Sequence, residues 1–315
     1  MKRQGALGAA SLAIVLLAAC GGEERDAGGK RKVAVSIFPL YDVARRVAGD
    51  ELDVILVLPP GRSEHGFDPT PREMAQVAGA DLGVVVGLEM DPWASRIIRG
   101  AAGDDTEILE LGPAVEPRRL SAPEVGVDLL EHAREHGHDH DDHDDHDDHD
   151  DHDDHEGHDD HDHDEEEEGE AHGHHEEAHH HHGAFDPHFW LDPLRMVTAV
   201  DRLVDAFARL DPAHADGFRE RGEAVKRELR ALHDQLEERA EGWDGQTIVT
   251  FHGSFGYFAE RYGLTIAAVI EPFPGREPTP RYMQEVLEAI RASGTRALFS
   301  EPQLDPRPGR VIAQQ

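Results

Sequence analysis

Three histidines lie in loops that mix polar, proline and aromatic residues, and their side chains could bind a metal ion. His65 lies in the segment PPGRSEHGFDPTP, His188 in DPHFWLDP and His252 in TFHGSFGYF. Imidazole is a good ligand for zinc, and three histidines with one oxygen make a tetrahedral site. A lone loop histidine is more often a surface or hydrogen-bonding residue. The residues alone therefore leave a shared site as a hypothesis.

Short apolar segments alternate with helical patterns around these histidines. Runs of β-branched residues indicate strands, and 3.6-residue periodicity with start signals such as Thr70-Pro71 indicates helices. This alternation predicts an α/β protein with mainly parallel sheets flanked by helices on both faces. Ligands of such sheets bind at the carboxyl ends of strands, where His65 and His252 follow predicted strands. The expected strands are 32–38, 53–58, 82–87, 247–251, 265–270 and 296–300. The expected helices are 39–50, 70–79, 193–211, 213–241, 254–262 and 279–293.

Five segments make the chain resemble a known family, the metal-binding lipoproteins of bacterial ABC transporters for zinc and manganese. The resemblance covers residues 32–315 apart from one acidic tract. It implies two α/β lobes, over 32–212 and 242–315, joined by one long linking helix over 213–241. It also implies a metal site in the cleft between the lobes. The segments that carry it are PPGRSEHGFDPTP, GLEMDPW, DPHFWLDP, FHGSFGYFAERYGL and LFSEPQLDPRP.

The resemblance assigns the role of metal ligand to His65, His188 and His252. Manganese-type relatives tend to have a glutamate where this chain has His252. Manganese prefers carboxylate, and zinc suits imidazole. The third histidine therefore favours Zn²⁺ as the ion of one tight site.

The fourth ligand is open between several groups. Asp305 lies where several relatives supply an aspartate ligand, and we expect it to be the fourth ligand. Glu64, beside His65, is the alternative, because it matches a glutamate that serves some zinc-specific relatives. Water could also take this position. Glu301 fits a structural role at a strand end.

A low-complexity tract interrupts the first lobe over residues 124–183. Of the 24 histidines, 19 lie between 132 and 182, and His140 to His161 repeat every third residue, mostly as HDD. Such a segment cannot bury a core, so we expect a disordered insertion in a loop. It resembles the histidine-rich loop of the zinc-uptake branch and could bind additional zinc ions weakly. The alternative is a solvated charged loop without a role.

The beginning of the chain is typical of an exported lipoprotein. Two basic residues precede an apolar run over 6–19. This run is too short to span a bilayer permanently but fits a signal peptide over 1–19. The sequence Leu-Ala-Ala-Cys ending at Cys20 resembles a lipobox, which implies lipidation of Cys20; an ordinary signal peptide is the alternative. Residues 20–31 are polar and glycine-rich, so we expect a flexible tether from the lipid.

The charge of the chain argues against nucleic acid as a partner. The net charge is −35, but residues 128–182 hold 26 acidic side chains and one basic one, so the acidity is local. A nucleic-acid binder would need a basic face. The sequence contains no HExxH motif and no nucleophile elbow, so we do not expect an enzyme.

These observations predict a monomeric, periplasmic or cell-surface protein held to the membrane by its lipid anchor. We expect it to bind Zn²⁺ with high affinity and deliver it to the permease of an ABC importer. The alternatives are an extracytoplasmic zinc buffer or chaperone without a transporter, and a manganese-preferring binding protein of an ABC importer. Relatives usually continue beyond the LFSEPQ segment, so we expect the second lobe to be incomplete.

Overall fold

The computed structural model describes residues 29–65, 67–121, 124, 185–272, 278–301 and 304–314. The described residues from Arg31 onward belong to one compact unit. The predicted signal peptide, the acylation of Cys20 and the tract over 128–182 lie outside the described residues. No helix in the described part of the chain is both long and apolar enough to cross a bilayer.

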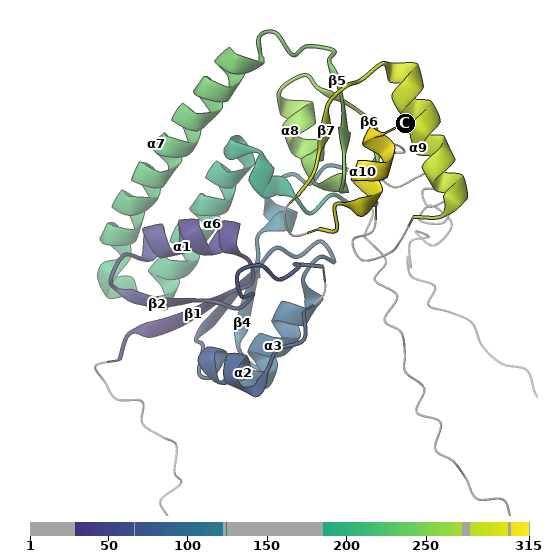
Figure 1. Ribbon diagram of the computed structural model, residues 1–315. Helices are drawn as coiled ribbons and strands as arrows, with labels where there is room; N and C mark the ends of the chain where they lie inside the picture. The colour runs from purple at the N-terminus through teal and green to yellow at the C-terminus, as the bar shows by residue number, and fades with distance from the viewer. Residues whose placement is uncertain are drawn as a thin grey trace, which may run out of the picture. The chain divides into compact units, whose positions relative to one another are not determined.

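The first half of the chain builds a four-stranded parallel sheet in the order β2-β1-β3-β4. The central strands β1 and β3 bury Val33, Ala34 and Val84 completely, as strands covered on both faces must. Helix α1 lies on one side of this sheet, and α2 and α3 lie on the other (Figure 1). The strands are β1 (Arg31–Val35), β2 (Leu52–Leu56), β3 (Leu82–Val85) and β4 (Glu107–Glu110). The helices are α1 (Phe38–Ala48), α2 (Pro71–Val77) and α3 (Pro92–Ala102).

Local sequence signals explain where these helices begin and end. Thr70 caps α2 through a capping box with Glu73, in which each side chain bonds the other residue's backbone N–H. Proline stands in the first turn of each of the three helices, where its missing N–H is not needed. Gly49 ends α1 at a φ of 62°, a conformation that a glycine adopts without strain. The helix start predicted at Thr70-Pro71 is confirmed.

Two long helices follow the undescribed tract and pack against α1. Helix α6 (Pro193–Leu210) and helix α7 (Ala215–Ala240) are joined by the short helix η3 (Pro212–His214). The rings of Phe207 and Phe218 meet edge-on between them, with centroids 5.9 Å apart.

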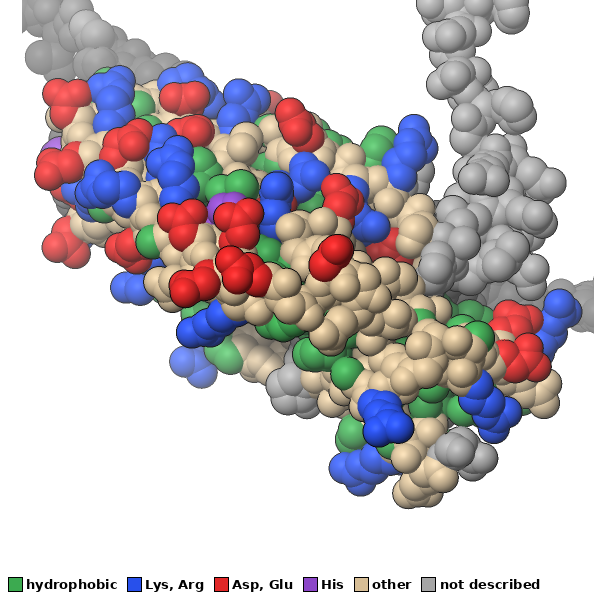
Figure 2. Space-filling view, turned by 90° about the horizontal axis from the view of Figure 1, so that it is seen from above, with side chains coloured by type: hydrophobic (Ala, Val, Ile, Leu, Met, Phe, Trp, Pro, Cys, Tyr) green, Lys and Arg blue, Asp and Glu red, His purple; other side chains and the backbone are tan. Residues whose placement is uncertain are grey.

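The outer surface of α7 is polar, as its sequence predicts. Arg221 of this helix donates to the backbone carbonyl oxygens of Val47 and Ala48 at 2.8 and 3.0 Å, and so satisfies the end of α1. Acidic and basic side chains are interleaved over the half of the surface in Figure 2 that holds α7. The helix therefore packs along one side only.

A second sheet of three parallel strands, in the order β6-β5-β7, follows α7. Its core contains Val249, Phe251, Ile270 and Val286. Helices α8, α9 and α10 surround this sheet (Figure 1). The strands are β5 (Thr247–Thr250), β6 (Thr265–Val269) and β7 (Leu298–Phe299). The helices are α8 (Gly256–Arg261), α9 (Pro280–Ser293) and α10 (Arg307–Ala313). The predicted α/β class with parallel sheets is confirmed.

Some elements of the described residues go beyond the expected set. Helix α3 and strand β4 form after the third expected strand, and β4 completes the first sheet. The outward-facing ends of β4, Glu107 and Glu110, are exposed, so its sequence EILE lacks the apolar run of the other strands. The last strand is shorter than expected, with two residues.

Candidate metal centre

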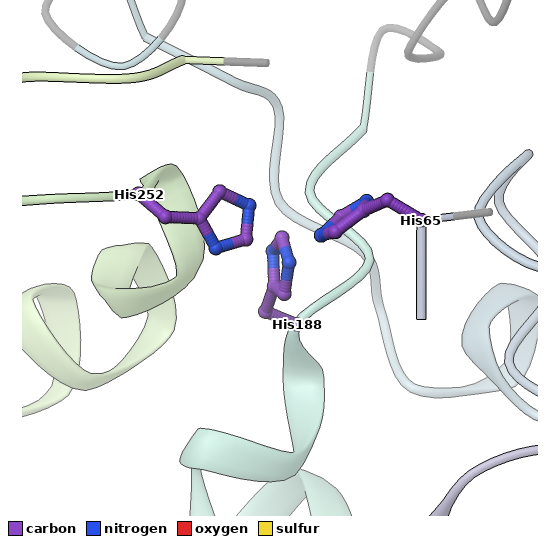
Figure 3. Close-up of side chains that lie close together, drawn as sticks. All are labelled: His65, His188 and His252. Carbon is purple, nitrogen blue, oxygen red and sulfur yellow. The ribbon is translucent and has the colours of Figure 1, made fainter. Parts of the chain in front are cut away.

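The three loop histidines meet at one point. One ring nitrogen from each of His65, His188 and His252 lies within 4.8 Å of the others. The ring centroids are 4.7 Å apart for His65 and His252, 4.8 Å for His188 and His252, and 5.7 Å for His65 and His188. Their side chains are only 8%, 4% and 3% exposed in chain order. Figure 3 shows the three rings pointing toward one another from separate segments.

His65 lies in the loop that follows β2, and Trp93 of α3 supports this loop. The indole Nε1 of Trp93 donates to the backbone oxygen of Glu64 at 2.9 Å. The ring of Phe67 packs edge-on against the indole, with centroids 5.3 Å apart. The backbone N–H of His65 donates to Ser63 Oγ at 3.3 Å. Trp93 is 3% exposed, so a buried side chain fixes the segment that presents His65.

A tight turn between β3 and α3 holds Trp93 in place. The buried carboxylate of Asp91 accepts two backbone N–H groups of this turn at 2.8 and 2.9 Å. Leu88 and Glu89 have positive φ angles of 52° and 62°, which is uncommon for residues with a side chain. The hydrogen bonds to Asp91 offset the cost of this conformation. The GLEMDPW segment therefore serves the site indirectly, by placing Trp93.

His188 is oriented by the carboxylate of Asp186, two residues before it. Asp186 Oδ1 lies 2.8 Å from His188 Nδ1 and also accepts the backbone N–H of His188 at 2.9 Å. A carboxylate on Nδ1 fixes the tautomer in which Nε2 carries the lone pair. Nε2 of His188 is buried and has no hydrogen-bond partner among the described residues. This nitrogen is therefore available to a metal ion.

The charge of Asp186 is maintained although the residue is fully buried. Burial alone would raise the pKa of this carboxyl group, but the hydrogen bonds from His188 and the charge of Arg118 lower it. A charged carboxylate on Nδ1 makes the imidazole a stronger ligand.

His252 follows β5 directly and begins the short helix η4 (Gly253–Phe255). Its Nδ1 lies 3.4 Å from Glu301 Oε1, which also accepts the hydroxyl of Ser254 at 3.0 Å. Burial lowers the pKa of His252, and nearby His188 lowers it further, whereas Glu301 opposes both effects. The ring is therefore neutral at neutral pH, and neutral imidazole is the form that binds metal.

The three carboxylates considered for the fourth ligand lie in different surroundings. Glu301 contacts His252, and Glu64 Oε1 lies 4.0 Å from Nε2 of His65. Asp305 has a side chain that is 43% exposed, and it accepts a hydrogen bond from Arg307 Nε at 2.6 Å. The histidine cluster does not include Asp305. Its assignment as the fourth ligand therefore stays a prediction.

The donor set fits zinc better than a harder ion. A tetrahedral zinc ion with Zn–N bonds of about 2.0–2.1 Å separates its nitrogen ligands by about 3.3 Å. Ring nitrogens within 4.8 Å of one another reach this spacing through small side-chain movements. Three nitrogen donors also suit zinc more than manganese or magnesium.

A cavity of about 490 Å³ opens beside the histidines. Glu64, Ser254 and Glu301 line it, and these residues also support the cluster, so the cavity adjoins the site. Trp190 lines the cavity as well and packs edge-on against His188, with ring centroids 5.2 Å apart. The rest of the lining is mainly apolar, from the start of α1 and the loop after β2.

Sequence reasoning did not identify the residues that support the ligands. The role of Asp186 could have been inferred from the spacing in DPH, because a carboxylate two residues before a histidine can reach its ring. Trp93 lies in the recognised segment GLEMDPW, but its role in holding the His65 loop depends on α3, which was not expected. Arg118, which contacts Asp186, lies outside all five recognised segments.

A buried set of three imidazoles, supported by two parallel-sheet units, defines a metal-binding protein of the α/β class. Residues 33–315 match the family described as "Zinc-uptake complex component A periplasmic" (ZnuA), and the chain belongs to this family. The expected resemblance to metal-binding proteins of ABC transporters is thereby confirmed. The family consists of solute-binding proteins of transporters and is not an enzyme family.

Relatives and solved structures agree with this assignment. The zinc-binding lipoprotein AdcA of Streptococcus pneumoniae is 26% identical over 93% of this chain and 49% of its own length. The chain thus spans about half the length of such streptococcal relatives. The Mn²⁺ complex of FpvC from Pseudomonas aeruginosa has a TM-score of 0.66 at 19% identity, over 91% of this chain and 85% of FpvC. A crystal structure of ZnuA has a TM-score of 0.65 at 18% identity, over 91% and 88% of the two chains. These structural likenesses concern the fold.

Proposed function

We propose that this chain is an exported zinc-binding protein that captures Zn²⁺ with high affinity and delivers it to an ABC importer. The observation that carries the proposal is the convergence of His65, His188 and His252, three buried imidazoles from distant segments. Membership of the zinc-uptake family supports it. So does the name of the streptococcal relative, a zinc-binding lipoprotein.

Zinc is the metal that this site selects, although the fold alone does not decide it. FpvC has the same fold and was solved with Mn²⁺. In this chain the three donors are nitrogen atoms, and manganese prefers carboxylate and water oxygen. The manganese-preferring alternative would need a carboxylate at the position of His252.

Zinc capture would depend on ligands that come from two lobes of the chain. We propose two lobes over 32–212 and 242–315, connected by the helix over 213–241. The first lobe contributes His65 and His188, and the second contributes His252. Zinc draws the third imidazole toward the other two, and delivery requires these ligands to separate. Zinc is the cargo here, so no chemical step occurs on the protein.

The fourth donor is an oxygen that completes the tetrahedron. The resemblance points to Asp305, which would have to leave Arg307 to bind the ion. Glu64 already lies 4.0 Å from Nε2 of His65 and would need less movement. Comparing Asp305→Asn with Glu64→Gln distinguishes the two: the ligand is the residue whose amide variant weakens zinc binding.

The remaining parts of the chain fit the same role. We propose that lipidation of Cys20 anchors the protein to the outer side of the membrane, where it meets the permease of the importer as a monomer. The segment over 124–183 would collect further zinc ions weakly.

Zinc uptake by the native bacterium tests this function. Deleting the gene should reduce uptake of radioactive zinc under zinc limitation. The wild-type gene should restore uptake, and the His252→Ala variant should not. Uptake that is unchanged by the deletion would contradict the proposal.

A further inference from the structure

Arg118 lies behind the metal site and contacts the supports of two of its ligands. Its side chain is 14% exposed, and it follows the short helix η1 (Gly112–Ala114) of the first half of the chain. It does not touch the three histidines. All its guanidinium nitrogens bind carboxylates, and these carboxylates come from three separate segments.

The first contact reaches His188. Arg118 Nη1 donates to Asp186 Oδ2 at 2.8 Å, while Asp186 Oδ1 binds His188 Nδ1 at 2.8 Å. Both oxygens of this carboxylate are therefore held, one by the arginine and one by the ligand. The backbones are joined as well, because Asp186 N–H donates to the carbonyl oxygen of Arg118 at 2.9 Å. A carboxylate fixed at both oxygens cannot rotate, so the ring of His188 keeps its direction.

The second contact reaches the segment that follows His252. Arg118 Nε donates to Glu260 of α8 at 3.1 Å, and the backbone N–H of Arg118 donates to the hydroxyl of Tyr257 at 3.1 Å. That hydroxyl in turn donates to the backbone oxygen of Asp186 at 2.8 Å. Helix α8 begins at Gly256, four residues after His252. The same small group of bonds therefore joins the support of His188 to the element behind His252.

The third contact is with Glu124. This carboxylate is 1% exposed and binds Arg118 through both of its oxygens, at 2.6 and 3.1 Å. Ser121 donates to it from its backbone N–H at 2.8 Å. A side chain on Gly256 would overlap both the guanidinium of Arg118 and the carboxylate of Glu124, so only glycine allows α8 to approach them. The ion pair of Arg118 and Glu124 thus packs directly against the start of α8.

We propose that Arg118 is a positioning residue of the metal site, which orients His188 through Asp186 and holds His252 near it through α8. This inference deepens the proposed function and rests on it. Separation of the ligands on delivery must break the bonds of Arg118 to Glu260 and Tyr257. Arg118 therefore slows the release of zinc more than it changes the rate of capture.

The test is the release of one equivalent of zinc from the full chain to an excess of a chelator, followed by stopped flow. We expect Arg118→Ala to speed release by about 10- to 100-fold, the usual cost of removing a residue that supports a metal ligand. Association should change less. Arg118→Lys keeps a charge but reaches fewer partners, so its rate of zinc release should fall between those of the wild type and Arg118→Ala. The control is Arg119→Ala, because Arg119 is the exposed neighbour that lies over the ring of Phe185.

A spectroscopic measurement separates positioning from general destabilisation. Co²⁺ in place of zinc gives visible absorption bands that report a tetrahedral site. Arg118→Ala should change these bands, while Arg119→Ala should not. The proposal would be overturned if Arg118→Ala had the same rate of zinc release and the same Co²⁺ bands as the wild type. It would also be overturned if Arg119→Ala changed both by as much as Arg118→Ala.

A second variant keeps the test decisive if Arg118→Ala does not fold, since Arg118→Ala leaves two buried carboxylates without their arginine partner. The side chain of Glu260 is 59% exposed, so Glu260→Ala removes the acceptor of one bond without leaving a buried charge. It should speed release several-fold, and unchanged release would overturn the tie to α8. If the wild-type chain itself binds no zinc tightly, the proposed function fails together with this inference. If the wild type binds and the Arg118 variants behave like it, only this inference fails.

Discussion

At the scale of single residues, we expect metal choice to depend on His252, whose imidazole would supply the third nitrogen. Replacing it with glutamate gives two imidazoles and a carboxylate, a set that suits manganese better. We expect His252→Glu to lower the ratio of zinc affinity to manganese affinity by at least about tenfold, measured by competition between the two ions.

The matched control for that change is His252→Gln, which removes the imidazole without adding a charge. It should weaken zinc binding without improving manganese binding. A wild-type protein from which manganese displaces zinc at comparable concentration would contradict the assignment.

The pH dependence of zinc binding also follows from His252. Protons compete with metal for an imidazole, and free histidine has a pKa of about 6.5. Because burial lowers the pKa of His252, its ring stays neutral to a lower pH than a free imidazole. The tight site should therefore keep zinc at pH 5.5. Histidines among dense carboxylates, as in 128–182, should have raised pKa values and lose zinc between pH 7 and 6.

The number of zinc ions bound per chain at pH 7.5 and at pH 5.5 tests this difference between the tight site and residues 128–182. We expect several ions per chain at pH 7.5 and about one at pH 5.5. Loss of every ion over the same pH range would contradict this difference between the two kinds of site.

The pH dependence of the stability of the metal-free protein also follows from His252. Because the pKa of His252 is lower in the folded than in the unfolded state, the unfolded state binds the proton more readily. The contribution of His252 to stability is therefore lost as the pH falls below about 6.5.

The sequence, through its family resemblance, singled out the three histidines that the structure brings together, but not the residues around them. His65, His188 and His252 stand in loops beside predicted elements, and this placement could be read from local patterns. Trp93 and Arg118 act through contacts between distant segments, which no local pattern encodes. Asp186 lies two residues before His188, so its role could have been inferred from the spacing. The fourth ligand was expected to be Asp305, with Glu64 as the alternative, and the sequence could not decide between them because the choice depends on tertiary contacts.

At the scale of elements, the packing of α6 against α7 depends on a glycine. A side chain on Gly222 would overlap Val204 of α6. Overpacking of this kind costs about 1–3 kcal/mol. We expect Gly222→Val to lower the free energy of unfolding by about this amount, measured by urea denaturation, and to leave zinc affinity unchanged.

Gly242→Val is the control for this prediction, because nothing lies within 4 Å of the position that its side chain would occupy. It should change stability little. Equal destabilisation by both variants would show that the close approach at Gly222 is not what holds the helices together.

The same elements show which parts of the fold local signals determine. The start of α2 could be predicted because Thr70, Pro71 and Glu73 act within one turn. Strand β4 could not, because Glu107 and Glu110 are exposed and its pairing with β3 is a tertiary contact. Helix α7 was predicted from its periodicity over 213–241, but its packing on α1 through Arg221 was not.

At the scale of the whole molecule, the acidic tract should be separable from the tight site. The three histidines come from outside residues 128–182, and a long insertion in a loop contributes little to the core. Deleting this segment should therefore leave one tight zinc ion and remove the weak ones, as measured by calorimetry. Loss of the tight ion on deletion would show that the segment supplies one of its ligands.

X-ray absorption spectroscopy of the zinc-loaded protein lacking 128–182 tests the central claim most directly. The deletion is needed because the histidines of that segment would add their own signal. With one equivalent of zinc, we predict scattering from three imidazole rings and one oxygen, with Zn–N distances of about 2.0–2.1 Å. His252→Ala in the same background should remove one imidazole. A first shell made of oxygen atoms, or a spectrum that His252→Ala leaves unchanged, would contradict the assignment of this site.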